Sequence, residues 1–98
     1  MNPRVSFHPL ADVELNEASH FYNTESPGLG GVFLDELERT IDRILEHPDA
    51  GILVAGNVRR RLIPRFPYGV LYRIKGDQVR ILAIMHQKRR PFYWQSRR

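Results

Sequence analysis

The sequence contains no cysteine, and no stretch approaches the roughly 20 consecutive apolar residues that a membrane-spanning helix requires. The absence of cysteine excludes a disulfide framework, a thiolate nucleophile and a metal site with sulfur ligands. No N-terminal run joins basic residues to a continuous apolar segment, as a secretory signal would. We therefore expect a cytoplasmic protein, without membrane contact, that folds without covalent cross-links.

Each half of the chain is also poor in charge of one sign. Residues 1–50 contain three basic and ten acidic residues, a net charge of −7, whereas residues 51–98 contain twelve basic residues and one acid, Asp77, a net charge of +11. Such a split favours an acidic or polyanionic partner for the C-terminal half. The alternative is a basic surface that only keeps the protein soluble, but like charges gathered on a small sheet cost stability unless something uses them.

Periodicity of apolar residues predicts two helices after a short strand at residues 4–7. The first should span about residues 9–25, and the second should begin with Ser26 as its cap and Pro27 at its first position. His47 should end it, because the residue before Pro48 is disfavoured in helical geometry. The carboxylates of these helices are expected to form a solvated outer face: Glu17, Glu36, Glu38, Asp42 and Glu46.

Residues 49–57 are predicted to form a loop, and β-type alternation predicts strands over residues 58–63, 68–75 and 78–86. The two-residue link Gly76-Asp77 is typical of a type II′ hairpin turn. Ninety-eight residues suffice for one domain with a modest core. The predicted fold is therefore α+β, in the order β-α-α-β-β-β, with a helical hairpin packed on one face of a small, mainly antiparallel sheet.

The hairpin turn fixes a register for the last two strands, in which Lys75 faces Gln78 and Tyr68 faces Met85. Alternation then assigns these residues to the face that packs on the helices: Tyr68, Val70, Tyr72, Ile74, Val79, Ile81, Ala83 and Met85. The opposite face receives the remaining ones: Gly69, Leu71, Arg73, Lys75, Gln78, Arg80, Leu82, Ile84 and His86.

This opposite face combines charge with apolar side chains. Arg73 lies directly across from Arg80, which destabilises a sheet unless an anion or solvent relieves the repulsion. If the two helices cover only the other face of the sheet, three apolar side chains on this face would be exposed to solvent: Leu71, Leu82 and Ile84. An apolar patch rimmed by positive charge is typical of a binding groove. The alternative is that the C-terminal segment folds back over these side chains.

Basic and aromatic residues are concentrated at the end of VRILAIMHQKRRPFYW, residues 79–94: His86, Lys88, Arg89, Arg90, Tyr93 and Trp94. They include the groups that a metal-independent ribonuclease needs, namely a base, an acid, cations for the phosphorane and aromatic rings for stacking. The alternatives are a structural histidine and a segment that binds without cleaving. No metal-ligand spacing or phosphate-loop motif accompanies these residues, so we expect no metal or cofactor.

The chain resembles the RelE/ParE superfamily of bacterial toxins from type II toxin–antitoxin modules, which includes plasmid stabilisation proteins. The resemblance covers nearly the whole chain, as a single toxin domain over residues 1–98. It lies in the opening FHPLADVELNEASHFY, the helix after SPGLG and the segment RRRLIPRFPYGVLYRIKGDQVRILAIMHQKRR. The most specific part is PYGVLYRI followed by a tight turn, an apolar strand and HQKRR.

The resemblance implies a toxin that arrests growth until a usually acidic antitoxin forms a complex with it and covers its sheet and groove. Contact with operator DNA would occur only through the antitoxin. ParE-like members block DNA gyrase, whereas RelE-like members cleave mRNA on the ribosome without a metal. For the nuclease alternative the candidate catalytic residues are Arg59, Arg61, His86, Arg89 and Tyr93. Candidates for contact with target or antitoxin are Arg65, Leu71, Arg73, Arg80, Leu82, Ile84, Lys88, Arg90 and Trp94.

One position departs from the pattern of the ribonuclease members. They place an arginine between the tyrosine and the aliphatic pair of PYGVLYRI, where this chain has Gly69. Loss of one charge-assisted contact to the phosphorane would cost about 2–4 kcal/mol of transition-state stabilisation, although Arg65 or Arg73 could substitute. The resemblance therefore favours a gyrase-binding toxin over a ribosome-dependent endonuclease. A plain interaction module that only holds an acidic protein segment is the third hypothesis.

Overall fold

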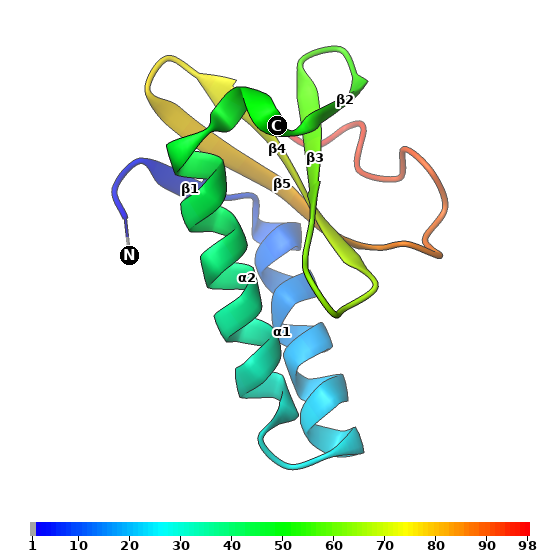
Figure 1. Ribbon diagram of the computed structural model, residues 1–98. Coiled ribbons are helices and arrows are strands. Elements are labelled where there is room, and N and C mark those ends of the chain that lie inside the picture. Colours follow the sequence, from blue (N-terminus) through cyan, green and yellow to red (C-terminus); the bar gives the residue numbers. More distant parts are fainter. Residues whose placement is uncertain (1) are drawn as a thin grey trace.

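The computed structural model describes residues 2–98 and places a helical hairpin on one face of a five-stranded sheet (Figure 1). The elements are β1 (Val5–Phe7), α1 (Pro9–Glu25), α2 (Leu29–Glu46), the 3₁₀-helix η1 (Pro48–Ala50), β2 (Ile52–Ala55), β3 (Val58–Leu62), β4 (Tyr68–Lys75) and β5 (Gln78–His86). The strands are ordered β1-β5-β4-β3-β2, with β1 parallel to β5 and the other neighbours antiparallel. The predicted α+β class is confirmed.

Residues 49–57 were predicted to be a loop, and this prediction is wrong, because they contain most of η1 and the edge strand β2. β2 has only four residues, ILVA, and all are apolar, so no alternation marks them as a strand. Gly51 precedes β2 where Tyr72 lies so close that an added Cβ would overlap its hydroxyl group. That hydroxyl donates a hydrogen bond to the carbonyl oxygen of Pro48 (2.6 Å), which fixes η1 against the sheet.

The two helices begin and end through different local signals. The side chain of His8 accepts a hydrogen bond from the N–H of Leu10 (3.0 Å) at the start of α1, where Pro9 takes the first position. Ser26 was predicted to cap α2 but instead caps the C-terminus of α1, and its N–H bonds to the carbonyl of Tyr22. The chain reverses at Gly28, whose positive φ of 89° suits glycine. The predicted end of α2 before Pro48 is confirmed.

Gly30 is the point at which α1 and α2 touch through their backbones. An added Cβ would overlap the carbonyl oxygen of Ser19 and lie 2.7 Å from Cγ of Asn23. We expect Gly30→Ala to lower the free energy of unfolding by about 1–3 kcal/mol, because the helices must separate. Chemical denaturation measures this change. Gly31→Ala is the matched control, since its Cβ would meet nothing within 4 Å; equal losses in both variants would contradict the prediction.

The main core lies between the helices and the sheet. It consists of Val5, Ala11, Ala18, Phe33, Leu37, Ile44, Ile63, Val70, Tyr72, Val79, Ile81 and Ile84. A second, smaller cluster lies on the other side of the sheet and consists of Val58, Leu71, Leu82, Ala83 and Trp94. Both faces of the sheet are therefore covered at its centre.

The predicted hairpin register is confirmed from Lys75–Gln78 to Tyr72–Ile81 and then shifts by one residue. Gly76 has a φ of 63°, as the first central position of a type II′ turn requires. Beyond Tyr72 a bulge leaves Leu71 facing Ala83 and Tyr68 facing His86. The extra residue reverses the alternation. The predicted faces of Ala83, Ile84, Met85 and His86 are therefore wrong, and Ile84 belongs to the main core.

Candidate functional site

The segment after β5, residues 87–98, has no helix or strand and returns to the sheet face opposite the helices; we call it the strap. Trp94 of the strap is 3% exposed and packs in the second cluster with Leu71 and Leu82, which are each 1% exposed. The prediction that these leucines line an open groove is therefore wrong. The alternative, that the C-terminal segment folds back, is what the structure shows.

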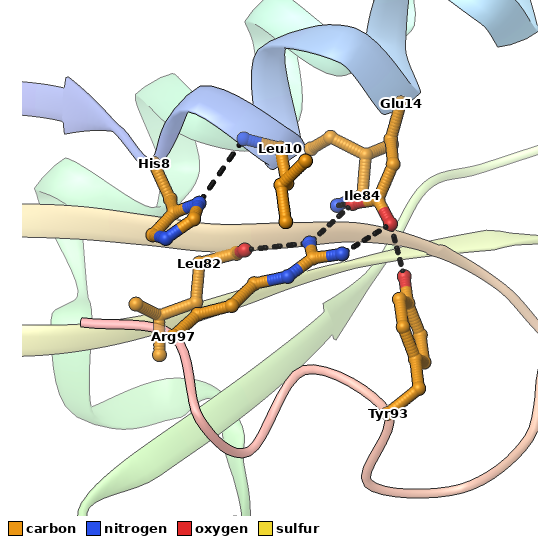
Figure 2. Close-up of polar contacts among 7 residues, drawn as sticks. All are labelled: His8, Leu10, Glu14, Leu82, Ile84, Tyr93 and Arg97. Atoms are coloured by element: carbon orange, nitrogen blue, oxygen red, sulfur yellow. Dashed lines mark hydrogen bonds and ion pairs between the residues drawn. The ribbon is translucent and has the colours of Figure 1, made fainter.

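Glu14 of α1 holds the strap in place (Figure 2). Its carboxylate accepts hydrogen bonds from the N–H of Ile84 (3.0 Å), the hydroxyl of Tyr93 (2.7 Å) and the guanidinium of Arg97 (2.8 and 3.1 Å). Arg97 also donates to the carbonyl of Leu82 (3.0 Å). β1 pairs with only the first part of β5, so these contacts satisfy backbone groups on the open edge beyond it. We call Glu14, Tyr93 and Arg97 the latch.

Burial and the hydrogen bond to Glu14 raise the pKa of Tyr93 well above its ordinary value. The phenol is therefore protonated at neutral pH, and its hydroxyl donates a hydrogen bond to the carboxylate of Glu14. Arg89 stacks on the same ring, with its guanidinium carbon 3.9 Å from the ring centroid. The hydroxyl of Tyr93 thus serves the latch and cannot act as a base in this arrangement.

The structure divides the five candidate catalytic residues between two places. Arg59 shares a face with Tyr72, which it opposes across β3 and β4, and its guanidinium donates to the carbonyls of Asp49 (3.0 Å) and Gly51 (2.8 Å). Arg61 lies two residues further along the same side of β3. These two arginines therefore belong to the η1 side of the sheet.

The other three candidates lie near the end of β5. His86 packs edge-on against Tyr68, with ring centroids 4.9 Å apart, and its Nδ1 accepts the N–H of Lys88 (3.0 Å). His86 and Arg89 line a hollow of about 290 Å³ beside α1, and Tyr93 is bound to Glu14 on the wall of that hollow. The structure thus brings together His86, Arg89 and Tyr93 but not Arg59 and Arg61.

The candidate binding residues differ in how accessible they are. Leu71, Leu82, Ile84 and Trp94 are buried. Arg73 and Arg80 are partly buried, and Lys88 and Arg90 are exposed. Arg65 is engaged by Glu36, with its guanidinium 3.0 Å from the carboxylate.

Glu36 was predicted to lie on a solvated outer face, and this prediction is wrong. It is 8% exposed, and its carboxylate binds both Arg39 (2.9 Å) and Arg65 (3.0 Å). Arg65, with a positive φ of 69°, lies in the loop between β3 and β4, 29 residues away along the chain. The helical periodicity that placed Glu36 on a surface carried no information about that loop.

Arg60 is a candidate that the sequence analysis did not select. It lines a hollow of about 340 Å³ together with Arg89, Phe92 and Trp94, and its Nε is buried without a hydrogen-bond partner among the described residues. A Cβ at Gly69 would lie 3.2 Å from Cγ of Arg60. Because Gly69 has no side chain, the aliphatic part of the Arg60 side chain has room on this face of the sheet. Alternation along a strand over residues 58–63 puts Arg60 on the side opposite Arg59, and this is the signal by which the sequence could have identified it.

The strap side of the sheet is basic and has no acidic side chain. None of the five strands contains Asp or Glu, and neither does the strap. Arg60, Arg73, Lys75 and Arg80 alternate onto this side, and the strap adds Lys88, Arg89, Arg90 and Arg98. The acids lie in the helices, in η1 and in the turn at Asp77. The molecule is therefore acidic on its helical layer and basic on the other side, as the charge split indicated.

Within residues 2–98, neither helix combines the length and the hydropathy that crossing a membrane requires. This part of the chain also has no group of three or more His, Asp or Glu side chains that could hold a metal ion.

A family model described as the ParE toxin of the type II toxin–antitoxin system parDE matches residues 5–91. Among solved structures, a chain of the chromosomal ParDE TA system from P. aeruginosa superposes with a TM-score of 0.73 and 17% sequence identity, over 84% of this chain and 92% of that chain. At this identity the likeness concerns the fold. No curated protein matches.

Proposed function

Because this chain belongs to the ParE toxin family of type II toxin–antitoxin systems, we propose that it arrests growth by binding DNA gyrase. The proposed contact surface is the strap side of the sheet together with the strap. The observation that carries this proposal is the absence of Asp and Glu from the five strands and the strap, combined with eight basic residues on the strap side. Such a surface attracts a negatively charged target over distances of about a Debye length.

Membership in a toxin–antitoxin family implies an antitoxin partner. We propose that this antitoxin is acidic and neutralises the toxin by covering the strap side. The acidic helical layer would repel such a segment, because α1 and α2 together carry nine of the eleven acids. Exposed Phe92, with half of its surface accessible, offers an apolar contact beside Arg89 and Arg90.

Ribosome-dependent cleavage of mRNA receives less support. Arg59 and Arg61 lie away from His86, the hydroxyl of Tyr93 is bound to Glu14, and Gly69 supplies no side chain. Primer extension on translated mRNA is expected to show no new cuts after toxin expression. Cuts within codons that disappear in His86→Ala and Arg89→Ala would replace the gyrase proposal with the endonuclease.

The gyrase proposal predicts two results with the intact chain. Induced expression should stop growth, and co-expression of the antitoxin encoded beside it should restore growth. Purified toxin at micromolar concentration should inhibit supercoiling by gyrase. Growth arrest without inhibition of supercoiling would remove gyrase as the target, and harmless expression would leave only an interaction module.

A further inference from the structure

We propose that Arg60, on the strap side of β3, binds a carboxylate of the antitoxin in a groove with apolar walls. This inference rests on the proposed function for its partner, the antitoxin, and adds the contact that anchors this partner. Arg60 lines two hollows, of about 340 and 150 Å³, and Met85 and Gln87 also line both of them. The two hollows therefore meet at these three residues and form one groove.

The groove follows from the register of three neighbouring strands. Leu62 faces Gly69, and Gly69 faces Met85, so this row of the sheet has no side chain at its centre. Arg60 lies on the same side of β3 as Leu62. Its aliphatic part lies over Gly69, where an added Cβ would be 3.2 Å from Cγ and 3.4 Å from Cδ of Arg60. The missing side chain thus makes the room in which Arg60 lies.

The guanidinium of Arg60 has no anionic partner in the part of the chain that the structure describes. No ion pair over residues 2–98 includes it, and its Nε is buried without an acceptor. None of the described residues that line the two hollows is Asp or Glu. The terminal carboxylate of Arg98 is bound to Arg80 (3.2 and 3.3 Å) and borders a different hollow. An acceptor from a partner would satisfy the Nε, whose loss of hydration is otherwise uncompensated.

The lining of the groove favours a protein segment over a nucleic acid. Leu62 lines one hollow and is 65% exposed, and Phe92 lines the other and is 50% exposed. Of the described residues that line the two hollows, two are cations, Arg60 and Arg89, whereas a phosphate backbone is usually followed by a longer row of cations. A guanidinium also matches a carboxylate in shape and can bind both of its oxygens. The groove therefore suits an acidic side chain with apolar neighbours in its own chain.

The first test measures the affinity of the full toxin for its antitoxin by titration calorimetry. Arg60→Met keeps the length of the side chain and removes its charge and its buried donor, so the variant should fold. It should bind the antitoxin at least about tenfold more weakly, because a hydrogen bond to a charged group contributes more than the roughly 1.4 kcal/mol that corresponds to a tenfold change in affinity. Arg43→Met removes an exposed charge from α2 and should bind like the unchanged chain.

Two further variants test the chemistry of the groove. Arg60→Lys retains the charge but not the planar fork, so its loss of affinity should be intermediate. Leu62→Ser changes an exposed side chain, so the fold should be retained while antitoxin binding weakens several-fold. This second variant tests the groove independently of any effect that a change at Arg60 has on folding.

A set of antitoxin variants identifies the carboxylate. Each Asp and Glu of the antitoxin is changed to its amide and titrated against the unchanged toxin and against Arg60→Met. One amide variant should bind the unchanged toxin more weakly but cause no further loss with Arg60→Met, because the two changes remove the same contact. If no amide variant shows this coupling, Arg60 does not bind a carboxylate of the antitoxin.

The outcomes distinguish this proposal from the proposed function. Unchanged affinity in Arg60→Met and Leu62→Ser, with weaker binding in Arg73→Glu, would overturn the carboxylate site and leave the strap side as the antitoxin surface. Unchanged affinity in all three variants would overturn both. Weaker inhibition of gyrase by Arg60→Met, without weaker antitoxin binding, would assign the groove to the target instead. Binding of a labelled single-stranded DNA of about 12 nucleotides that Arg60→Met abolishes would assign it to a nucleic acid, and would equally overturn the proposal.

Discussion

Glu14→Ala is expected to lower the free energy of unfolding by about 3–5 kcal/mol, because it leaves one partner of a buried ion pair without its counter-charge. The side chains of Glu14 and Arg97 are 12% and 9% exposed, and the carboxylate also serves the N–H of Ile84 and the hydroxyl of Tyr93. All of these donors lose their acceptor in the variant. Urea denaturation followed by circular dichroism measures the loss.

Two further variants distinguish the loss of the latch contacts from the general effect that removing a helix carboxylate has on stability. Glu17→Ala, an exposed position one turn further along α1, should change stability by less than about 0.5 kcal/mol. Glu14→Gln retains an acceptor for Tyr93 but not the charge, so its loss should be intermediate. If Glu14→Ala and Glu17→Ala are equally stable, the latch does not hold the strap.

Trp94→Ala is expected to cost about 3–5 kcal/mol, the usual range for removing a large aromatic side chain from a core. Its indole packs in the second cluster with Leu71 and Leu82 on the strap side. The variant should therefore also expose these leucines and increase the binding of a hydrophobic dye. Denaturation must be followed by circular dichroism, because Trp94 is the single tryptophan of the chain.

Phe92→Ala is the matched control for Trp94→Ala. It removes an aromatic ring from the same strap, two residues away, but half of that ring is exposed. We expect a change of less than about 1 kcal/mol and no additional dye binding. An equally small loss in Trp94→Ala would show that the strap is not anchored by its indole.

The sequence predicts those parts of the fold that depend on local chemistry. The span of α1, the end of α2 before Pro48 and the start of the hairpin at Gly76 follow from proline, glycine and periodicity. The bulge in β5 does not, because it lies within the aliphatic run ILAIM, where either register would bury apolar side chains. The one-residue shift then moved every later side chain of β5 to the other face.

The candidate site was predictable to the extent that it depends on charge. The register fixed by the hairpin turn placed Arg73 opposite Arg80 correctly, and the second half of the chain, with Asp77 as its one acid, already marked the basic side. The latch could not be predicted, because Tyr93 and Arg97 lie 79 and 83 residues from Glu14. A tyrosine near the end of the chain therefore suggested catalysis, although its hydroxyl has a structural partner.

The most direct test of the central claim, that the toxin meets gyrase through the strap side, is a supercoiling assay with two charge-reversed variants. Arg73→Glu gains an opposite-charge partner in Arg80, so the fold should be retained. Arg43→Glu makes the same change of charge on the helical layer. Arg73→Glu should require at least about tenfold more protein to inhibit gyrase, since a reversed charge at an interface costs more than the roughly 1.4 kcal/mol that corresponds to a tenfold change in affinity. Arg43→Glu should act like the unchanged chain, and equal inhibition by both variants would contradict the account.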